Sequence, residues 1–313
     1  MKQSPLPSRV VVTGGAGFIG THTVRRLLQA GVEIMVIDDL RHACAEPVPT
    51  QAQLLRADIA SSAAHLALRE FRPGAIIHLA AQGGVNRSLR DPAADATVNV
   101  VGTVALLRAA VDAECHRVVF ASSGGAIYGR AKRLPSRETD RAQPLSPYGA
   151  AKLACEGYLG MFSRTFGIHF LALRYGNVYG PYQDGTGEAG VVAISASRLR
   201  DGNAPQITGD GAQVRDFTYV GDVAAANLLA LGSSYQGAIN IGTGRPAAVN
   251  EVVAELVQSA GFAGPAEQVA ARPGEVRATY LDPSRARARL GWEAKVGLGE
   301  GLGVTYESFA GLS

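Results

Sequence analysis

Short apolar runs alternate with longer segments of helical period from residue 9 to about residue 173, and this alternation constrains the fold more than any other feature. The apolar runs are RVVVTG, EIMVID, QLLRAD, AIIHLA, HRVVFAS and IHFLALR, and the helical segments include residues 18–30, 92–111 and 147–166. Strands that are apolar throughout and separated by helices are typical of a parallel sheet with helices on both faces. We therefore predict an α/β fold built on a doubly wound parallel sheet.

A glycine-rich loop, TGGAGFIG at residues 13–20, directly follows the first predicted strand. Its G-x-G-x-x-G and G-x-x-G-x-x-G spacings allow a tight turn and bring the backbone close to a pyrophosphate at the helix N-terminus. Asp38 ends the second predicted strand, about 18 residues after the last of these glycines. A carboxylate there accepts hydrogen bonds from the adenosine ribose and repels a 2′-phosphate. The sequence therefore predicts a Rossmann domain that binds NAD rather than NADP, although Arg41 would soften that preference.

Further strand ends should line the same crevice, because ligands bind outside the carboxyl ends of the strands in open α/β sheets. His78, in one of these strands, is expected to be a core histidine rather than a ligand. The predicted cofactor contacts are Gly14, Gly17, Phe18, Ile19, Gly20, Asp38, Asp39, Asp58, Ile59, Leu79, Ala80, Ala81, Gln82 and Asn99, together with the pair Tyr148 and Lys152.

That pair lies in the segment SPYGAAK, where Tyr148 and Lys152 are four residues apart and so share one face of a predicted helix. A tyrosine with an ordinary pKa of about 10 is almost fully protonated at neutral pH. A neighbouring ammonium and a positively charged nicotinamide would lower that pKa. The spacing therefore predicts a tyrosine base tuned by a lysine.

After residue 175 the pattern is less regular, with a Gly-rich stretch at residues 180–190, short strands near PQITG, RDFTYV and AINIG, and helices from about residue 222, near 249–259 and near 283–290. This part predicts a smaller C-terminal α/β lobe that covers the carboxyl edge of the sheet and binds the substrate. We assign residues 1–175 to the NAD-binding domain and residues 176–313 mainly to the smaller lobe, with some segments returning to the first domain.

Composition excludes several classes of protein. The net charge is only +3 and there is no dense Lys/Arg run, so nucleic acid is not an expected partner. Cys44, Cys115 and Cys155 are odd in number and widely spaced, and the six histidines form no ligand pair, so neither disulfides nor a metal site are expected. The N-terminal stretch MKQSPLPSRV lacks the apolar core of a signal peptide, and no apolar run is expected to approach the length of a membrane span. We expect a cytoplasmic protein that does not bind membranes.

Eight motifs make the chain resemble, over nearly its whole length, the extended short-chain dehydrogenase/reductases that act on nucleotide sugars, and most closely the UDP-glucose (galactose) 4-epimerases. The motifs are TGGAGFIG, HLAAQ, NVVGT, SSGGAIYG, SPYGAAK, NVYGP, RDFTYV and NIGTG. The resemblance implies that Tyr148 takes the proton of the sugar C4 hydroxyl while hydride passes to NAD. The 4-keto sugar then turns over and takes the hydride back on its other face. The resemblance also implies a homodimer formed through the helices at 92–111 and 147–166.

The segment SSGGAIYG narrows the reaction. Related nucleotide-sugar dehydratases carry an Asp-Glu pair where this chain has Gly125 and Ala126, so water elimination would lack a general acid here. Many epimerases place a catalytic Ser or Thr where this chain has Gly124. Either Ser123 or Ser122 supplies the hydroxyl from a shifted position, or Tyr148 acts directly with a water molecule.

The resemblance also implies substrate contacts in the smaller lobe. Arginine suits phosphate oxygens, and Arg215 and Arg272 match positions that hold the diphosphate, although an ion pair with Asp216 or Asp222 would also explain Arg215. The implied contacts are Asn177, Arg215 and Arg272 for the diphosphate, Val191, Gln206 and Thr208 for the base, and Asp282 for its ribose.

The leading hypothesis is thus an NAD-dependent UDP-sugar 4-epimerase of the UDP-glucose/UDP-galactose type. One alternative is a 4-epimerase of UDP-glucuronate or another nucleotide sugar, and a second is a net NAD(P)-dependent keto-sugar oxidoreductase. A non-catalytic NAD-sensing protein is disfavoured because such proteins tend to lose Tyr or Lys, and this chain has both Tyr148 and Lys152. The sequence does not decide the nucleotide or the sugar.

Overall fold

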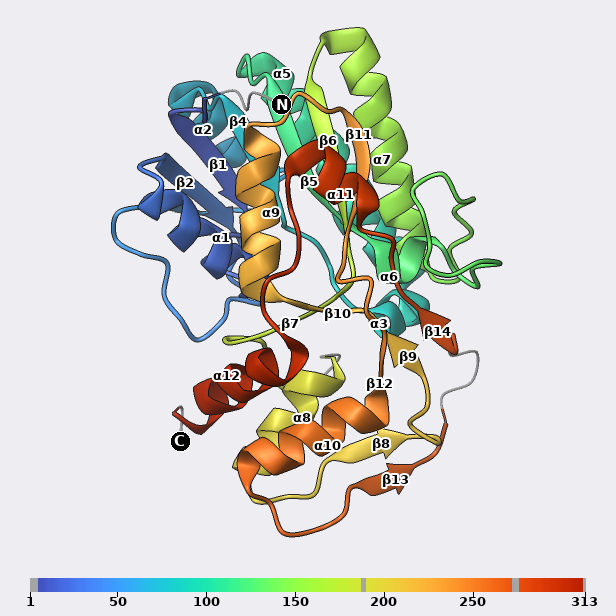
Figure 1. Ribbon diagram of the computed structural model, residues 1–313. Helices are drawn as coiled ribbons and strands as arrows, with labels where there is room; N and C mark the ends of the chain where they lie inside the picture. Colours follow the sequence, from blue (N-terminus) through green and yellow to red (C-terminus); the bar gives the residue numbers. More distant parts are fainter. Residues whose placement is uncertain (1–4, 187–189, 272–275, 312–313) are drawn as a thin grey trace.

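The computed structural model describes residues 5–186, 190–271 and 276–311 of the chain. Figure 1 shows a larger lobe built around a sheet and a smaller lobe that lies beyond the ends of its strands. The sheet has seven strands in the order β11-β6-β5-β4-β1-β2-β3. Its strands are β1 (Arg9–Thr13), β2 (Glu33–Asp38), β3 (Gln53–Arg56), β4 (Ala75–His78), β5 (Arg117–Ser123), β6 (His169–Tyr175) and β11 (Gly237–Ile241).

Every neighbouring pair of strands in this sheet is parallel, which confirms the predicted doubly wound fold. The chain builds outward from β1 through β2 and β3, and then returns to the other side of β1 as β4. The strand order therefore reverses between β1 and β4. A crevice forms at such a reversal, outside the carboxyl ends of the strands, and it is the usual ligand site of this architecture.

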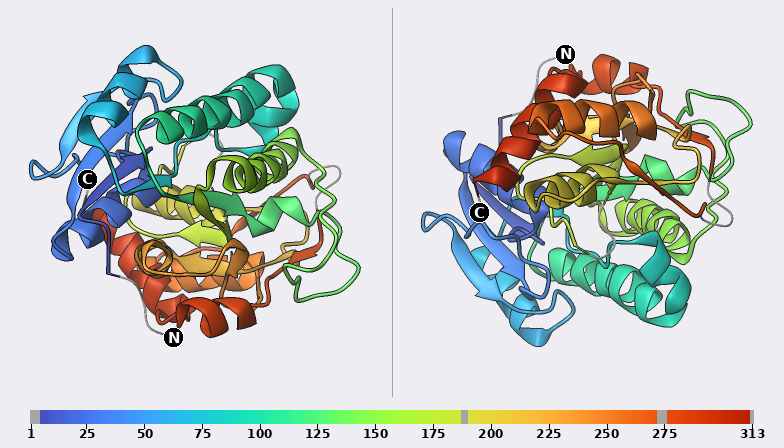
Figure 2. Two further views of the ribbon diagram at one scale, coloured as in Figure 1. Left: turned by 90° about the horizontal axis from the view of Figure 1, so that it is seen from above. Right: turned by 90° about the horizontal axis from the view of Figure 1, so that it is seen from below.

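Helices cover both faces of the sheet, as the two views in Figure 2 show. Val10 and Val12 of β1 belong to one apolar cluster and Val11 to the other, because successive side chains of a strand point to opposite faces. This explains why the strands are apolar throughout. One layer contains α1 (Phe18–Gln29), α9 (Val220–Leu231) and α11 (Ser284–Leu290), and the other contains α2 (Ser62–Phe71), α5 (Gly102–Asp112) and α7 (Pro147–Phe166).

The helix predicted at residues 92–111 is continuous but not uniform. It consists of α4 (Pro92–Ala96), a π-helical turn η1 (Thr97–Val101) and α5. The expectation that no run has the length of a membrane span is wrong for Pro92–Asp112, which by length and composition alone could cross a membrane. However, Leu106 and Leu107 are buried in the cluster between α5 and the sheet, as expected for a core helix.

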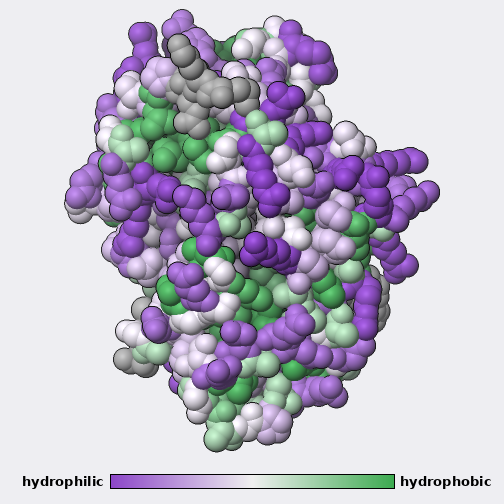
Figure 3. Space-filling view, viewed as in Figure 1, coloured by the Kyte–Doolittle hydropathy of each residue, from purple (hydrophilic) through white to green (hydrophobic). Residues whose placement is uncertain are grey.

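The smaller lobe has its own apolar core, which includes Val192, Val252 and Leu302. Its elements are β7 (Asn177–Tyr179), α8 (Val191–Arg200), β8 (Gln206–Thr208), β9 (Val214–Arg215), β10 (Phe217–Tyr219), β12 (Ala247–Ala248), α10 (Val249–Ala260), β13 (Glu267–Val269), β14 (Ala278–Thr279) and α12 (Leu298–Ala310). The segments of α9, β11 and α11 return to the larger lobe. On the face seen in Figure 3, apolar residues gather in small groups among polar ones.

Candidate active site

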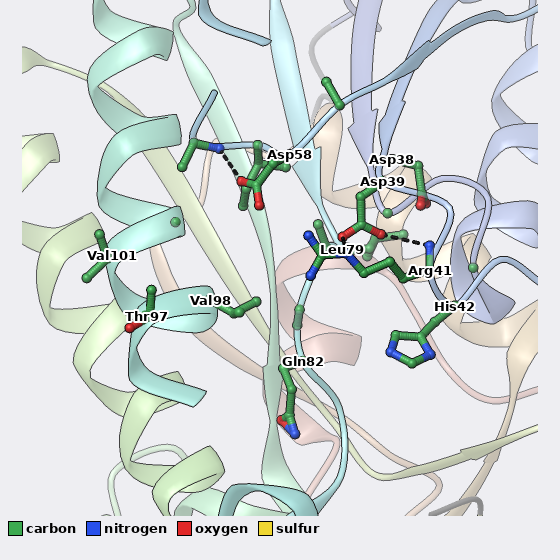
Figure 4. Close-up of a pocket in the computed structure, with 18 of the residues that line it drawn as sticks. Asp38, Asp39, Arg41, His42, Asp58, Leu79, Gln82, Thr97, Val98 and Val101 are labelled. Atoms are coloured by element: carbon green, nitrogen blue, oxygen red, sulfur yellow. Dashed lines mark hydrogen bonds and ion pairs between the residues drawn. The ribbon is translucent and has the colours of Figure 1, made fainter. Parts of the chain in front are cut away.

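The first cavity, of about 270 Å³, lies at the reversal of strand order between β1 and β4. Figure 4 shows Asp38, Asp39 and Arg41 on one side of it and the helix carrying Thr97, Val98 and Val101 on the other. Predicted cofactor residues that line it are Gly14, Gly17, Asp38, Asp39, Asp58, Ile59, Leu79, Ala80, Ala81 and Gln82.

The glycine-rich loop packs directly against the end of β4. Gly14 has a positive φ of 69°, and a Cβ atom there would lie 2.5 Å from the backbone nitrogen of Ala80. A Cβ atom at Gly20 would collide with the carbonyl oxygen of Gly14. Because no side chain fits at either position, the loop leaves a narrow cradle of backbone at the N-terminus of α1.

Acidic side chains stand on the β2 side of this cavity. Asp38 accepts hydrogen bonds from the backbone nitrogens of Ala16 at 3.0 Å and Leu40 at 2.8 Å, so its carboxylate is fixed beside the loop. Asp39 pairs with Arg41, whose Nε lies 3.2 Å from a carboxylate oxygen. Arg41 is thereby partly neutralised by a carboxylate, an arrangement that suits ribose hydroxyls better than a second phosphate.

Gln82 lines this cavity with a side-chain amide whose hydrogen bonds are not satisfied by the described residues. Its side chain is buried, and neither Nε2 nor Oε1 has a hydrogen-bond partner among the described residues. The backbone of Gln82 is held by Asn99, whose Oδ1 accepts from Gln82 N at 2.9 Å and whose Nδ2 donates to Gln82 O at 3.1 Å. Buried amides are normally satisfied, so these atoms fit a polar ligand such as a dinucleotide in the cavity.

Several predicted cofactor residues do not line this first cavity. Phe18 and Ile19 form the start of α1. Gly20 is buried against the loop, Asn99 supports Gln82 from behind, and Tyr148 and Lys152 lie on α7. His78 is the core histidine that the sequence predicts, since its ring nitrogens contact the hydroxyls of Thr13 at 2.7 Å and Thr103 at 2.9 Å.

The second cavity, of about 590 Å³, opens between the two lobes. It is lined by Tyr148 from the larger lobe and by five of the predicted substrate residues, which are Asn177, Val191, Gln206, Thr208 and Arg215. No described residue that lines it is an aspartate or a glutamate. An acid that could eliminate water from a sugar is therefore missing from the described lining.

Gln213 is a lining residue that the sequence analysis did not identify. Its side chain is buried, its Nε2 donates to the carbonyl of Thr208 at 2.9 Å, and its Oε1 has no partner among the described residues. The free acceptor beside Gln206 and Arg215 suits a ligand hydroxyl or N–H. Its position after the turn at Asp210 and Gly211 offered no signal in the sequence.

Tyr148 and Lys152 lie on one face of α7, as their spacing predicts. Ser146 caps the helix by accepting a hydrogen bond from Gly149 N, and Pro147 occupies its first turn, so Tyr148 is held at a well-defined N-terminus. Lys152 is buried, with Nζ 4.8 Å from the ring centroid of Phe120 and 5.7 Å from that of Tyr148.

The pKa of Tyr148 differs from the expectation. Burial raises the pKa of Tyr148 to about 12, although the nearby Ser123 acts in the opposite direction. Burial also lowers the pKa of Lys152 to about 8. In the protein alone, desolvation of the phenolate thus outweighs the effect of Ser123, and the carboxylate of Asp95 raises the pKa of Tyr148 further. The positive charge of a bound nicotinamide has to supply the remaining depression of the Tyr148 pKa.

The two candidate hydroxyls at the end of β5 point to different partners. Ser123 lies close enough to the Tyr148 phenol to lower its pKa. Ser122 donates instead to Glu156 at 2.6 Å, and Glu156 forms a buried ion pair with Arg174. The geometry therefore favours Ser123 as the hydroxyl at the reacting centre.

The glycines of SSGGAIYG have distinct surroundings. At Gly124 a Cβ atom would lie 2.6 and 2.7 Å from the two methyl carbons of Leu281, so a serine there would require the Leu281 side chain to move. At Gly125 the nearest atom to a Cβ is Oδ1 of Asn177, at 3.5 Å, which is an ordinary contact. The segment α6 (Gly124–Ile127) thus fits tightly under Leu281 and leaves space on the side of Asn177.

Asp216 and Asp222, the two carboxylates considered as ion-pair partners of Arg215, accept hydrogen bonds from other described residues. Asp216 accepts hydrogen bonds from Thr243, Gly244 and Leu281, and Asp222 accepts from Lys295 N and Val296 N. Arg215 donates to the carbonyl of Val214 and lines the second cavity.

Asp282, another predicted substrate residue, is not among the described residues that line this cavity. Asp282 is held at 2.9 Å by Nε of Arg137, and it accepts from Ser284 N at the start of α11. Arg272 lies outside the described residues.

Comparison with known proteins places the chain among nucleotide-sugar enzymes. The profile of the NAD dependent epimerase/dehydratase family matches residues 10–242. A UDP-glucose 4-epimerase of Mycolicibacterium smegmatis is 41% identical over 97% of this chain and 99% of its own length. A putative UDP-glucose 4-epimerase of Methanocaldococcus jannaschii is 40% identical over 94% of this chain and 95% of its own.

Similar solved structures include UDP-glucose 4-epimerases as well. UDP-glucose 4-epimerase from Thermotoga maritima, crystallised with UDP-glucose, superposes with a TM-score of 0.93 at 41% identity and covers 97% of this chain and 99% of that chain. The Thermus thermophilus enzyme in complex with NAD gives a TM-score of 0.92 at 43% identity, covering 97% of this chain and 100% of that chain.

Proposed function

The chain belongs to the NAD dependent epimerase/dehydratase family, and we propose that it interconverts UDP-glucose and UDP-galactose by inverting the sugar at C4. The observation that carries this proposal is the position of Tyr148. Its side chain lines the cavity between the lobes, where no described lining residue is an acid, and it shares one face of α7 with the buried cation Lys152. A base beside a described lining without acids favours oxidation and return at C4 over elimination.

NAD, when bound, accepts a hydride from C4 and returns it. The residues that would hold NAD are the glycine-rich loop, Asp38 and Gln82, whose backbone cradle and orphaned amide suit a dinucleotide. In this proposal Tyr148 takes the proton of the C4 hydroxyl and returns it to the same oxygen after the keto sugar has turned over. Ser123 stabilises the phenolate through its hydroxyl group, and Lys152 stabilises it electrostatically.

The nucleotide would occupy the smaller lobe. Arg215 suits the diphosphate because a guanidinium can form two parallel hydrogen bonds with phosphate oxygens. Gln206, Thr208 and Gln213 supply polar groups for the base and ribose, and the orphaned Oε1 of Gln213 is an acceptor for a ribose hydroxyl or the uracil N–H. These features support UDP as the nucleotide, and the assay with different UDP-sugars identifies the sugar.

The test is an assay of the purified protein with UDP-galactose, UDP-glucuronate and their N-acetylated relatives, in which NMR reads the configuration at C4. We expect UDP-galactose and UDP-glucose to interconvert without added cofactor. No net change in absorbance of reduced nicotinamide should accompany turnover, since an epimerase returns its hydride. A stoichiometric change in that absorbance would instead identify a net oxidoreductase.

We further propose a cytoplasmic homodimer. Cys44, Cys115 and Cys155 are free, as is usual in a reducing compartment. Helix α7 presents the exposed residues Ala150, Ala154 and Tyr158 at successive four-residue intervals. Small and aromatic side chains in one stripe suit close packing against the same helix of a second copy.

A further inference from the structure

Asp95 is a buried acid that the proposed reaction does not use. It lies on α4 and is only 1% exposed. Its Oδ1 accepts a hydrogen bond from Nδ2 of Asn99 at 3.0 Å, but its Oδ2 has no partner among the described residues although that atom is buried. A buried carboxylate is costly unless a positive charge or further hydrogen bonds compensate it.

The charged and titratable groups around Asp95 come from the elements packed on α4, which are η1, α3 (Val85–Arg90) and α7. Helix α3 carries Arg87 and Arg90, whose side chains are exposed. Helix α7 brings Tyr148, Lys152 and Cys155 into electrostatic range of Asp95. Asp95 and Lys152 are both buried, on helices α4 and α7 that pack against each other, and no direct ion pair between them is formed among the described residues. Among the described residues on these elements, Lys152 is thus the buried cation within electrostatic range of Asp95.

Lys152 needs such a partner, because its other surroundings are largely apolar. Its Nζ stands over the rings of Phe120 and Tyr148, and His78 below it stays neutral because burial lowers the pKa of His78 to about 3. Burial lowers the pKa of Lys152 to about 8, and Cys155 and then the carboxylate of Asp95 oppose this fall. Without that charge the ammonium would lose its proton closer to neutral pH.

We propose that Asp95 is a positioning residue for the reaction, with its carboxylate acting as the buried counter-charge that keeps Lys152 protonated beside Tyr148. The same residue supports the cofactor cavity, since Asp95 holds Asn99 and Asn99 holds the backbone of Gln82. The catalytic meaning of this pairing rests on the proposed epimerase function, but the pairing itself can be measured without it.

The substitution Asp95→Asn tests the charge alone, because an asparagine has the same shape and its Oδ1 can still accept from Asn99. Removing the negative charge should lower the pKa of Lys152 and also that of Tyr148, since Asp95 raises both. Both limbs of a bell-shaped pH profile of kcat should therefore move toward lower pH, by about one unit for a partly screened buried pair.

A direct readout is available because the chain has only four lysines, at positions 2, 132, 152 and 295. NMR of protein labelled with ¹³C at the lysine side chains, saturated with NAD, gives four signals, and the variant Lys152→Met assigns the one from Lys152. We expect that signal to titrate about one pH unit lower in Asp95→Asn than in the unchanged protein. Glu114→Gln, which removes an exposed negative charge after the end of α5, is the matched control and should leave it unchanged.

Two results would overturn the proposal. One is an unchanged Lys152 titration in Asp95→Asn, and the other is a loss of activity that is equal at every pH. If Asp95→Asn does not fold, the reciprocal measurement serves, because Lys152→Met should raise the pKa of a ¹³C-labelled Asp95 carboxyl group. An inactive but otherwise unaltered protein in which Lys152 titrates as expected would contradict the proposed function and leave the pairing intact.

Discussion

Tyr148→Phe removes the phenol oxygen and keeps the aromatic ring at this position of α7. Because the proposed reaction needs that oxygen as the base, Tyr148→Phe should lower kcat by at least about 100-fold. The amount of NAD that copurifies should not change. Tyr306→Phe, on α12 of the smaller lobe, is the matched control and should keep full activity. Full turnover by Tyr148→Phe would contradict the mechanism.

The neighbouring serines can be separated by kinetics and stability. Ser123→Ala removes the hydroxyl that lowers the pKa of the Tyr148 phenol, so we expect kcat to fall about 10-fold and the acid limb of its pH profile to move to higher pH. Ser122→Ala removes a donor to Glu156 and should cost about 1 kcal/mol of unfolding free energy while kcat changes little. The opposite assignment would show kcat falling in Ser122→Ala alone. Steady-state rates and urea unfolding of both variants decide this.

For individual residues, the sequence predicted those contacts that are made between residues close together in the chain. The pairing of Tyr148 with Lys152 follows from four-residue spacing on a helix. The choice between Ser122 and Ser123 stayed open, because it depends on which face of β5 is covered by Glu156 of α7. Asp95 and Gln213 carried no local signal. Their orphaned oxygens are defined only by elements that are distant in the chain.

Gly124 lies where β5 meets α6, and a side chain at this position should collide with Leu281. Gly124→Ser would push a Cβ atom into Leu281, which is itself only 2% exposed and has little room to move. We expect this variant to lose about 2 kcal/mol of unfolding free energy. The double variant Gly124→Ser with Leu281→Ala should show a smaller loss than the sum of the single changes, because the two side chains share one space. Gly125→Ser should be nearly neutral, since Cβ there meets only an ordinary contact. Equal losses at Gly124 and Gly125 would contradict this account.

His78 of β4 contacts β1 and α5 and should make the free energy of unfolding depend on pH in the acidic range. His78 bridges Thr13 and Thr103, and burial lowers the pKa of His78 from 6.5 to about 3. Between these values the unfolded chain binds more protons than the folded one, so stability present above pH 6.5 is lost as the pH falls toward 3. The loss between pH 7 and pH 4.5 should be about 2 kcal/mol. Urea unfolding should show a smaller loss for His78→Gln, whereas His116→Gln, which changes an exposed histidine, should behave like the unchanged protein.

At the scale of the whole molecule, the alternation of apolar runs with helical segments predicted the parallel sheet, and the less regular pattern after residue 175 predicted a smaller lobe. The sequence did not predict α12, whose segment LGEGLGVTYESFA contains glycines that weaken a helical pattern. Gly301 is required there because any side chain would collide with the hydroxyl of Tyr179. Nor could it decide the partners of Arg215 and Asp282, since those depend on how separate loops meet between the lobes.

The proposed homodimer predicts how a substitution at Ala154 changes the oligomeric state of the protein. Ala154 is exposed in the middle of the α7 stripe, so a second copy packed there would have no room for a long cation. Ala154→Arg should give a monomer by sedimentation, whereas the unchanged protein should sediment as a dimer. The matched control Ala254→Arg places the same side chain at an exposed position of α10 in the smaller lobe and should leave the dimer intact. Because α7 also carries Tyr148 and Lys152, loss of the second copy should lower the thermal stability of that helix and raise KM for the sugar nucleotide. A protein that is monomeric before the substitution would show that the stripe serves another contact.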